Sequence, residues 1–256
     1  MQPVPDSNAV PPGGRVRRSR RILRWLVLVT VGLLAALTIV LVMAFPSVAA
    51  AACPRCFGLS EVAPGVYTTA DARPEQARAL TGLVAEARER VAAFYGTQES
   101  SPTVVACFDD ACYSRIGGGG ERGVAVLDQA VMLSPRGIDV GILAHEMSHV
   151  ELHDRLGGAQ GKVPQWFDEG LAVIAGDDRR YIAPPGSADR CLVRAARPLP
   201  ASLDEWVKAA STDADEYAEA ACEVSRWLAK YDTPQQATAQ LVEGLRSGAS
   251  FSSLVQ

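Results

Sequence analysis

Histidine is scarce in this sequence and is confined to one place. Only three of the 256 residues are histidines, and all three lie in the segment 145–153. The chain has a single C-x-x-C pair, Cys53 and Cys56, which disfavours a zinc site built from two such pairs. No Lys-Ser/Thr follows the glycine run 117–120, which excludes a phosphate-binding P-loop there. No internal repeat is evident.

Positive charge is also unevenly distributed. Six arginines lie before residue 25, and the acidic residue Asp6 is the only one before Phe45. Of the 25 basic and 29 acidic residues, 19 and 28 therefore follow Phe45, which gives that part a net charge of −9. The arginine run alone could indicate nucleic-acid binding, but the acidic remainder of the chain argues against a nucleic-acid partner.

No charged residue occurs from Trp25 to Phe45, a run of 21 residues rich in Leu, Val, Ala and Ile. A helix of about 20 apolar residues spans a bilayer. We therefore expect a transmembrane helix over residues 22–45, after a basic, disordered tail over residues 1–21. The positive-inside rule places that tail in the cytoplasm and residues 46–256 outside it.

Two alternatives to a retained anchor remain open. A signal peptidase could accept the small residues at 47–52, although a cleavable apolar region is usually only about 7–15 residues long. Ala50-Ala51-Ala52-Cys53 weakly resembles a lipoprotein site but lacks the large aliphatic residue at its start. We favour a retained, single-pass anchor in the cell membrane. This anchor and both alternatives to it would export the domain.

All six cysteines lie in the part that we expect outside the cytoplasm. An even number of cysteines in an oxidising compartment predicts disulfides. We expect the local pairs Cys107–Cys112 and Cys191–Cys222, with Cys53 and Cys56 either paired with each other or free. A redox role for the C-x-x-C is the alternative, but its place just after the apolar run favours a structural disulfide.

The histidines form the motif His145-Glu146-Met147-Ser148-His149, with His153 beyond it. Helix residues four apart lie one above the other, roughly 6 Å apart, so His145 and His149 can bind one metal ion from the same side. Glu146 can then act on a water molecule without being a ligand. His153 is about 12 Å along the helix from His145, so we expect it on the surface or beside the ligands.

A third ligand is required, because catalytic zinc sites usually have three protein ligands and an open position. Glu169 lies 20 residues beyond His149, within W-F-D-E-G-L-A. Pro164 suits the first turn of a new helix, and the glycine-rich segment 156–162 can turn the chain back. A second, antiparallel helix would bring Glu169 over both histidines. We therefore predict that His145, His149 and Glu169 bind Zn²⁺.

H-E-x-x-H followed by W-F-D-E-G-L-A resembles the gluzincin metallopeptidases, which include the thermolysin-like enzymes, the membrane alanyl aminopeptidases and the peptidase MA-like domains. The resemblance is close over residues 138–176 and looser over about 104–255. It implies a zincin-like fold, a peptide or protein substrate, zinc ligands at the three positions above, and Glu146 as general base. It also implies that a strand just before the active helix pairs with an extended substrate.

Gluzincins also place a hydrogen-bond donor beside the substrate carbonyl oxygen. Some use a histidine, but all three histidines of this chain lie in the helix 145–153, so a tyrosine is the natural substitute. The aminopeptidase branch implies Tyr217, with Tyr181 as the alternative, and a packed core role for Tyr217 is equally open. The G-x-M-E-N signature of aminopeptidases is missing, which leaves endopeptidase and exopeptidase action both open.

Local patterns predict an α+β fold for residues 46–256. A small mixed sheet should pack on the H-E-x-x-H helix, which Asp139 can cap, and a helical C-terminal part should follow. Asp128-Gln129 should form a hairpin turn between two short strands. The expected strands are 65–69, 103–108, 123–127 and 130–134, and the expected helices besides those of the site are 74–95, a short one after 202, 213–231 and 234–245.

These features together predict a membrane-anchored zinc metallopeptidase outside the cytoplasm that hydrolyses peptide bonds. One alternative is an exported domain that binds zinc or a partner without catalysis and is stabilised by disulfides. Another is a thiol-disulfide protein that uses Cys53 and Cys56.

Overall fold

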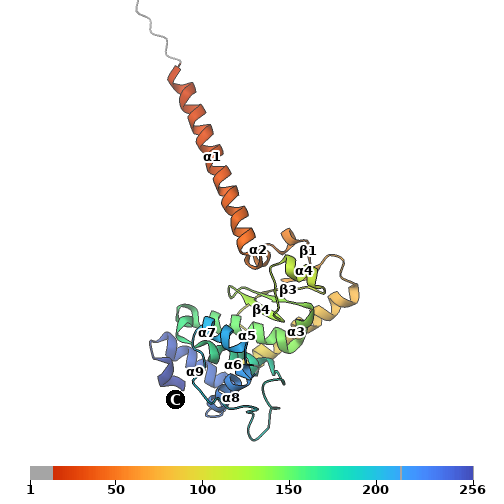
Figure 1. Cartoon of the computed structure of the whole chain (residues 1–256), viewed down its shortest axis with the longest axis vertical. Helices are drawn as coiled ribbons and strands as arrows, with labels where there is room; N and C mark the ends of the chain where they lie inside the picture. The colour runs from red at the N-terminus through yellow and green to blue at the C-terminus, as the bar shows by residue number, and fades with distance from the viewer. Residues whose placement is uncertain (1–13, 214, 256) are drawn as a thin grey trace, which may run out of the picture. The chain divides into compact units, whose positions relative to one another are not determined.

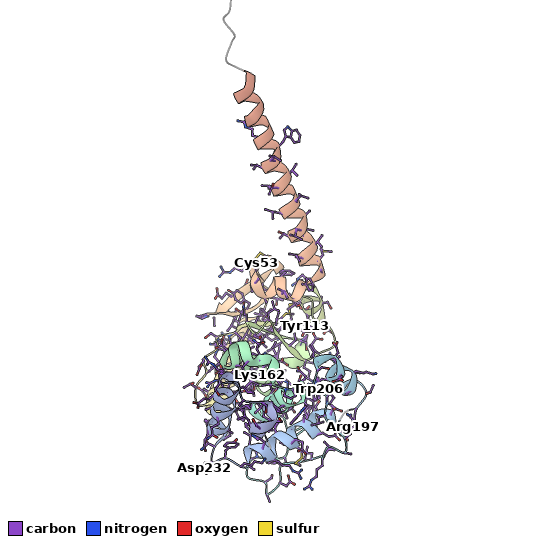
Figure 2. All side chains as sticks on the ribbon, turned by 90° about the vertical axis from the view of Figure 1, so that its left-hand side faces the viewer. Cys53, Tyr113, Lys162, Arg197, Trp206 and Asp232 are labelled. Atoms are coloured by element: carbon purple, nitrogen blue, oxygen red, sulfur yellow. A yellow bond between two sulfur atoms is a disulfide. The ribbon has the colours of Figure 1, made fainter. Side chains whose placement is uncertain are left out.

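The computed structural model describes residues 14–213 and 215–255, and the chain divides after residue 46 into two compact units. The first unit consists of helix α1, Gly14–Ala44. Its segment Arg24–Ala44 is long and apolar enough to cross a membrane, with a mean hydropathy of 2.9 and 0% of it buried. Side chains project from both sides of this helix (Figure 2), and large apolar ones such as Leu33 are exposed. A helix that is apolar on all sides is suited to a lipid environment.

Helix α1 begins earlier than the sequence predicted. It includes residues 14–21, which we expected in a disordered tail, whereas residues 1–13 lie outside the described part of the chain. Arginine is a good helix former, so the arginine-rich stretch can continue the apolar helix toward its N-terminus.

The second unit is a mixed α and β structure built around one sheet (Figure 1). Its described strands are β1 (Leu59–Ala63), β2 (Val66–Thr69), β3 (Thr103–Ala106), β4 (Gly123–Val126) and β5 (Ala130–Leu133). Its described α-helices are α2 (Pro46–Ala52), which begins at the boundary between the units, α3 (Pro74–Tyr95), α4 (Asp110–Arg115), α5 (Val140–Leu156), α6 (Gln165–Gly176), α7 (Leu203–Ala210), α8 (Glu216–Leu228), α9 (Pro234–Arg246) and α10 (Phe251–Val255). Short 3-10 helices lie at η1 (Pro54–Phe57), η2 (Pro135–Gly137) and η3 (Gly157–Lys162).

The sheet is small and mixed, as predicted. Its strand order is β1-β2-β3-β5-β4, with antiparallel pairs at both ends and parallel pairs on either side of β3. Strand β1 was not anticipated. Strand β4 forms one edge of the sheet and pairs with β5 from Gly123 opposite Leu133 to Val126 opposite Ala130.

The outer edge of β4 presents backbone groups at alternate residues. The N–H of Ser134 donates to the carbonyl oxygen of Arg122 at 2.9 Å, and bonded and non-bonded pairs alternate along an antiparallel ladder. The N–H and C=O groups of Val124 therefore face β5. Those of Gly123 and Ala125 point away from the sheet, where another chain could pair with them.

The β4–β5 hairpin turns at Leu127 and Asp128, one residue earlier than the predicted turn at Asp128-Gln129. Their φ angles are positive, 49° and 54°, and the N–H of Gln129 donates to the carbonyl oxygen of Val126 at 3.1 Å. Tight hairpin turns with two positive φ angles normally contain Asn or Gly. Leu127 therefore adopts a backbone conformation that costs about 1–2 kcal/mol.

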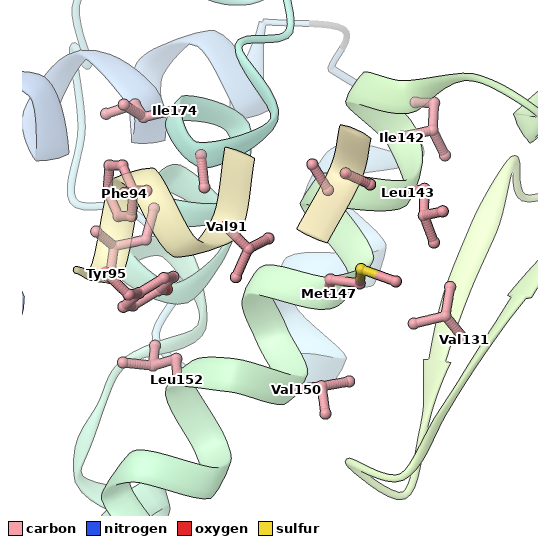
Figure 3. Close-up of a cluster of buried hydrophobic side chains, with 14 of the residues drawn as sticks. Val91, Phe94, Tyr95, Val131, Ile142, Leu143, Met147, Val150, Leu152 and Ile174 are labelled. Carbon is pink, nitrogen blue, oxygen red and sulfur yellow. The ribbon is translucent and has the colours of Figure 1, made fainter. Parts of the chain in front are cut away.

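The main core lies where helix α5 packs between the sheet and the other helices. Helix α5 contacts β4 and β5 as well as α3 and α6. Figure 3 shows Met147 and Leu143 of α5 facing Val131 of the sheet, with Val91 of α3 nearby, and all four side chains are fully buried. Burying such a side chain stabilises the fold by roughly 1.5–3 kcal/mol. The H-E-x-x-H helix is therefore fixed by the largest part of the core.

Three disulfides cross-link the second unit. Cys107–Cys112 and Cys191–Cys222 match the predicted pairs, and Cys53 pairs with Cys56. No free cysteine remains among the residues that the structure describes. Cys191–Cys222 joins the segment after α6 to the middle of α8, 31 residues further along the chain.

Candidate metal centre

Helix α5 presents His145 and His149 on one face. Asp139 caps the helix, because its Oδ1 accepts hydrogen bonds from the N–H groups of Gly141 at 2.8 Å and Ile142 at 3.2 Å. The predicted cap is thus present. The rings of His145 and His149 lie one turn apart, with their centroids separated by 4.9 Å.

Helix α6 packs closely on α5 and α8 because glycine occupies the crossing points. A Cβ atom on Gly170 would lie 2.6 Å from the carbonyl oxygen of Ala220 in α8, and one on Gly176 would clash with the carbonyl oxygen of Gly141 in α5. Any larger residue would force the helices apart. The glycine of W-F-D-E-G-L-A therefore has a packing role directly beside Glu169.

His145, His149 and Glu169 meet at one point, where their ligand atoms lie within 4.8 Å of one another. Glu169 Oε2 is 3.4 Å from His145 Nε2 and 3.7 Å from His149 Nε2, and the two Nε2 atoms are 3.2 Å apart. Glu169 Oε1 accepts a hydrogen bond from Gln165 at 3.2 Å, whereas the buried Oε2 has no hydrogen-bond partner within the described part of the chain. This group could hold a metal ion.

Asp168 orients His149, a role that the sequence reasoning missed. Its Oδ1 lies 2.8 Å from Nδ1 of His149, and its Oδ2 lies 2.6 Å from Nε2 of His153. A carboxylate on Nδ1 holds the proton there, so the neutral ring of His149 presents the lone pair of Nε2 to the metal site. The available signal was an aspartate directly before Glu169, together with a histidine one turn after His149.

His153 lies beside the ligands rather than free on the surface. Its Nδ1 is 2.6 Å from Oδ1 of Asp128, at the tip of the β4–β5 hairpin. With Asp168, it completes a chain of hydrogen bonds from the hairpin tip to His149. One of the two predicted places for His153 is therefore the observed one.

Electrostatic coupling within this chain shifts the pKa values of its members. Burial opposes a charge on His149, but the nearby carboxylates of Asp168 and Glu169 outweigh it and raise the pKa of His149 to about 10. Burial opposes the charge on Asp168 too, yet His149 and His153 hold the pKa of Asp168 well below its usual range. Before a metal binds, His149 and Asp168 therefore form an ion pair at neutral pH.

Glu146 is buried beside the group, next to strand β4. A Cβ atom on Gly123 would lie 2.9 Å from Cγ of Glu146, so glycine is needed for the strand to pass this close. Burial raises the pKa of Glu146, while the charges of His145 and His149 and the backbone N–H of Ala125 act in the opposite direction. A carboxylate with a raised pKa is a stronger base than an exposed one.

Tyr217 and Tyr181 line the same cleft as His145 and Glu146, a cavity of about 280 Å³. Their rings stack with centroids 5.1 Å apart, and the ring of Tyr217 lies 6.4 Å from that of His145. Burial, followed by the charge of Glu169, raises the pKa of Tyr217, so its hydroxyl keeps its proton. The structure therefore brings both predicted tyrosines to the cleft, with Tyr217 next to the metal-binding group.

Comparison with protein-family models, with curated proteins and with solved structures finds no match to this chain. The resemblance to gluzincins therefore rests on the sequence motifs alone.

Proposed function

We propose that this protein is a zinc metallopeptidase with a zincin-like domain, anchored by α1 in the cell membrane and acting outside the cytoplasm. The observation that carries the proposal is the convergence of Glu169 Oε2 with the Nε2 atoms of His145 and His149, beside the buried carboxylate of Glu146. The three disulfides and the apolar helix support export.

The spacing of the three ligand atoms suits zinc. Zn–N and Zn–O bonds of about 2.0–2.1 Å in a tetrahedron separate the ligand atoms by about 3.3 Å. The observed separations are 3.2, 3.4 and 3.7 Å. The described residues contribute three ligands to the group rather than four, which favours a catalytic site over a closed structural one. A zinc ion held there would supply a Lewis acid that acidifies water and polarises the substrate carbonyl.

Glu146 acts as the general base in this proposal. Its carboxylate takes a proton from the attacking water and delivers it to the amine that leaves. The raised pKa of Glu146 suits both steps, because the carboxylate binds the proton firmly enough to carry it. Tyr217 donates a hydrogen bond from its hydroxyl to the substrate carbonyl oxygen as negative charge develops there, and Tyr181 is the alternative donor.

The edge of strand β4 is the proposed substrate-binding strand. The N–H and C=O groups of Gly123 and Ala125 point away from the sheet, next to Glu146. The N–H of Ala125 donates to the carboxylate of Glu146, so the N–H of Gly123 and both C=O groups remain for a peptide. An extended peptide that pairs with them would pass its backbone along the cleft. Strand β5 is flanked by β3 and β4, so of the two strands expected before the active helix only β4 has an edge for this pairing.

Substitution of Glu146 by Gln separates catalysis from metal binding. We expect the zinc-loaded full chain to cleave a fluorogenic peptide library and Glu146→Gln to lower the rate about 10²–10⁴-fold, because the general base is lost. Both proteins should retain one zinc per chain by metal analysis. Unchanged cleavage in Glu146→Gln would contradict the mechanism, and metal binding without any cleavage by the unsubstituted chain would favour the non-catalytic alternative.

A further inference from the structure

A second, larger cavity adjoins the cleft and is lined mainly by charged residues. It measures about 830 Å³ and is lined by five arginines and three aspartates. It shares Arg122, Ile142, Asp178 and Arg180 with the smaller cleft that contains His145 and Glu146, so the two spaces lie next to each other.

The three aspartates of this cavity are already engaged. Asp139 accepts the hydrogen bonds that cap α5. Asp177 accepts from Arg179 at 2.9 Å and from Arg190 at 3.1 Å, and Asp178 pairs with Arg180. The carboxylates therefore neutralise neighbouring guanidinium groups or a helix end. Arg90, another arginine of the lining, pairs with Glu86 at 2.8 Å, which leaves Arg122 and Arg136.

Arg122 and Arg136 are held by backbone groups instead of carboxylates. Arg122 Nη1 donates to the carbonyl oxygen of Arg136 at 3.2 Å, and Arg136 Nη2 donates to that of Gly120 at 2.8 Å. A Cβ atom on Gly137 would clash with the carbonyl oxygen of Arg122, so glycine allows the two segments to lie together. The salt bridges of the described residues do not include either arginine, although the charge of Arg136 acts on the nearby Glu121 and helps to lower the pKa of that carboxyl. Each guanidinium thus keeps most of its five N–H donors free.

The charge of the cavity is opposite to that of the rest of the exported part. The residues after Phe45 carry a net charge of −9, whereas five arginines and three aspartates give this lining a net charge of +2. A cavity of one sign of charge concentrates ligands of the other sign.

The cavity begins where the proposed substrate-binding strand begins. Arg122 directly precedes Gly123, the first residue of β4. A peptide that pairs with the edge of β4 and extends beyond Gly123 would enter the space between Arg122 and Arg136. The fork geometry of guanidinium groups matches a carboxylate.

We propose that Arg122 and Arg136 bind a carboxylate of the substrate, so that the cleft selects peptides with an acidic group on that side of the cleaved bond. The carboxylate belongs either to an aspartate or glutamate side chain or to the free C-terminus of the peptide. This inference rests on the proposed function only in that it treats the bound peptide as a substrate. Binding of a carboxylate by the two arginines does not itself require hydrolysis.

The test measures binding by the zinc-loaded full chain with Glu146→Gln in detergent, so that peptides are not consumed. The probes are labelled peptides in which one glutamate is moved along a neutral, C-terminally amidated sequence, and a neutral peptide with a free C-terminus. Fluorescence anisotropy gives Kd for each. Because both arginines are exposed, we expect one carboxylate position to bind about three- to tenfold more tightly than its glutamine or amide counterpart.

Paired variants assign the effect to the two arginines. Arg122→Gln with Arg136→Gln should bring the ratio of Kd values to about one. The control, Arg78→Gln with Arg88→Gln, changes the net charge by the same amount at residues outside the cavity. The ratio of Kd values should therefore stay unchanged in this control. Arg122→Glu with Arg136→Glu should reverse the preference toward lysine, a gain that a misfolded protein cannot produce.

The outcomes distinguish this site from the proposed function. Equal Kd values for acidic and neutral peptides, no binding of either, or a preference that survives Arg122→Gln with Arg136→Gln would overturn the carboxylate site, even if the unsubstituted chain hydrolyses peptides. A preference that the arginines control, in a chain that hydrolyses none of these peptides, would support the site and contradict the peptidase.

Discussion

Two helices that follow one another in the chain, α5 and α6, carry His145, His149 and Glu169, and we call this side of the cleft the ligand wall. Tyr181 and Tyr217 form the other side, the tyrosine wall, and come from segments 36 residues apart. The ligand wall is largely buried, because α5 packs against α3 and the sheet and α6 packs against α8. The tyrosine wall is half-buried, and the Cys191–Cys222 disulfide joins its two segments. Short-range helix geometry thus builds the part that could hold a metal ion, whereas a disulfide between distant segments supports the part that would face a substrate.

The largest expected effect distinguishes the roles of Tyr217 and Tyr181. Tyr217→Phe keeps the stacked ring and removes only the hydroxyl, so we expect kcat to fall about 10²–10³-fold with little change in KM. Tyr181→Phe, the matched control, should change kcat less than about threefold. Steady-state kinetics on one peptide checks both, and the reverse ranking would make Tyr181 the donor and leave Tyr217 a packing residue.

A smaller effect tests the ligand wall without touching a ligand. Asp168→Asn removes the charge that orients His149, and we expect the Kd for zinc to rise about 10–100-fold. His153→Gln should have a smaller effect, because His153 contacts Asp168 and not the metal-binding nitrogen atoms. Competition with a zinc chelator gives Kd for each variant. Asp154→Asn on the exposed face of α5 is the control, and a loss of the same size there would contradict the assignment.

The smallest effect per step, about tenfold for each pH unit, is the dependence of metal binding on pH. The pKa of His149 is raised to about 10 in the metal-free protein, so below that pH zinc must displace its proton. Affinity should therefore increase with pH, by about tenfold per pH unit for one proton, when Kd is measured from pH 7 to 9. Asp168→Asn should flatten this slope, because it removes the largest of the charges that raise the pKa of His149. An affinity independent of pH would show that His149 is already neutral.

Sequence reasoning predicted the ligand wall because its information is local. The spacing of His145 and His149, the cap at Asp139 and the turn before Pro164 each act over a few residues, and the structure brings Glu169 to the histidines as expected. The mixed sheet and the pairs Cys107–Cys112 and Cys191–Cys222 were also predicted, whereas the pairing of Cys53 with Cys56 was one of two possibilities left open.

The parts that were missed depend on contacts between distant segments. Strand β1 and helix α4 are short, and they are stabilised by the second face of the sheet, where Val105 and Met132 are buried. Helix α8 begins at Glu216 rather than at Asp213, so Tyr217 lies in its first turn. The bond between Asp128 and His153 joins residues 25 positions apart, and no local pattern indicates it.

The turn of hairpin β4–β5 places Leu127 and Asp128 at positive φ angles, a backbone conformation that is unfavourable for Leu127. The side chain of Asp128 forms a hydrogen bond with His153. Two hydrogen bonds of 2.6 Å and one of 2.8 Å then connect that turn to His149. The strand that would bind a peptide and the imidazole that would bind an ion are in this way connected by hydrogen bonds. A substitution that weakens this connection at the hairpin turn, even far from the cleft, should therefore alter the position of His149, and the reverse should also hold.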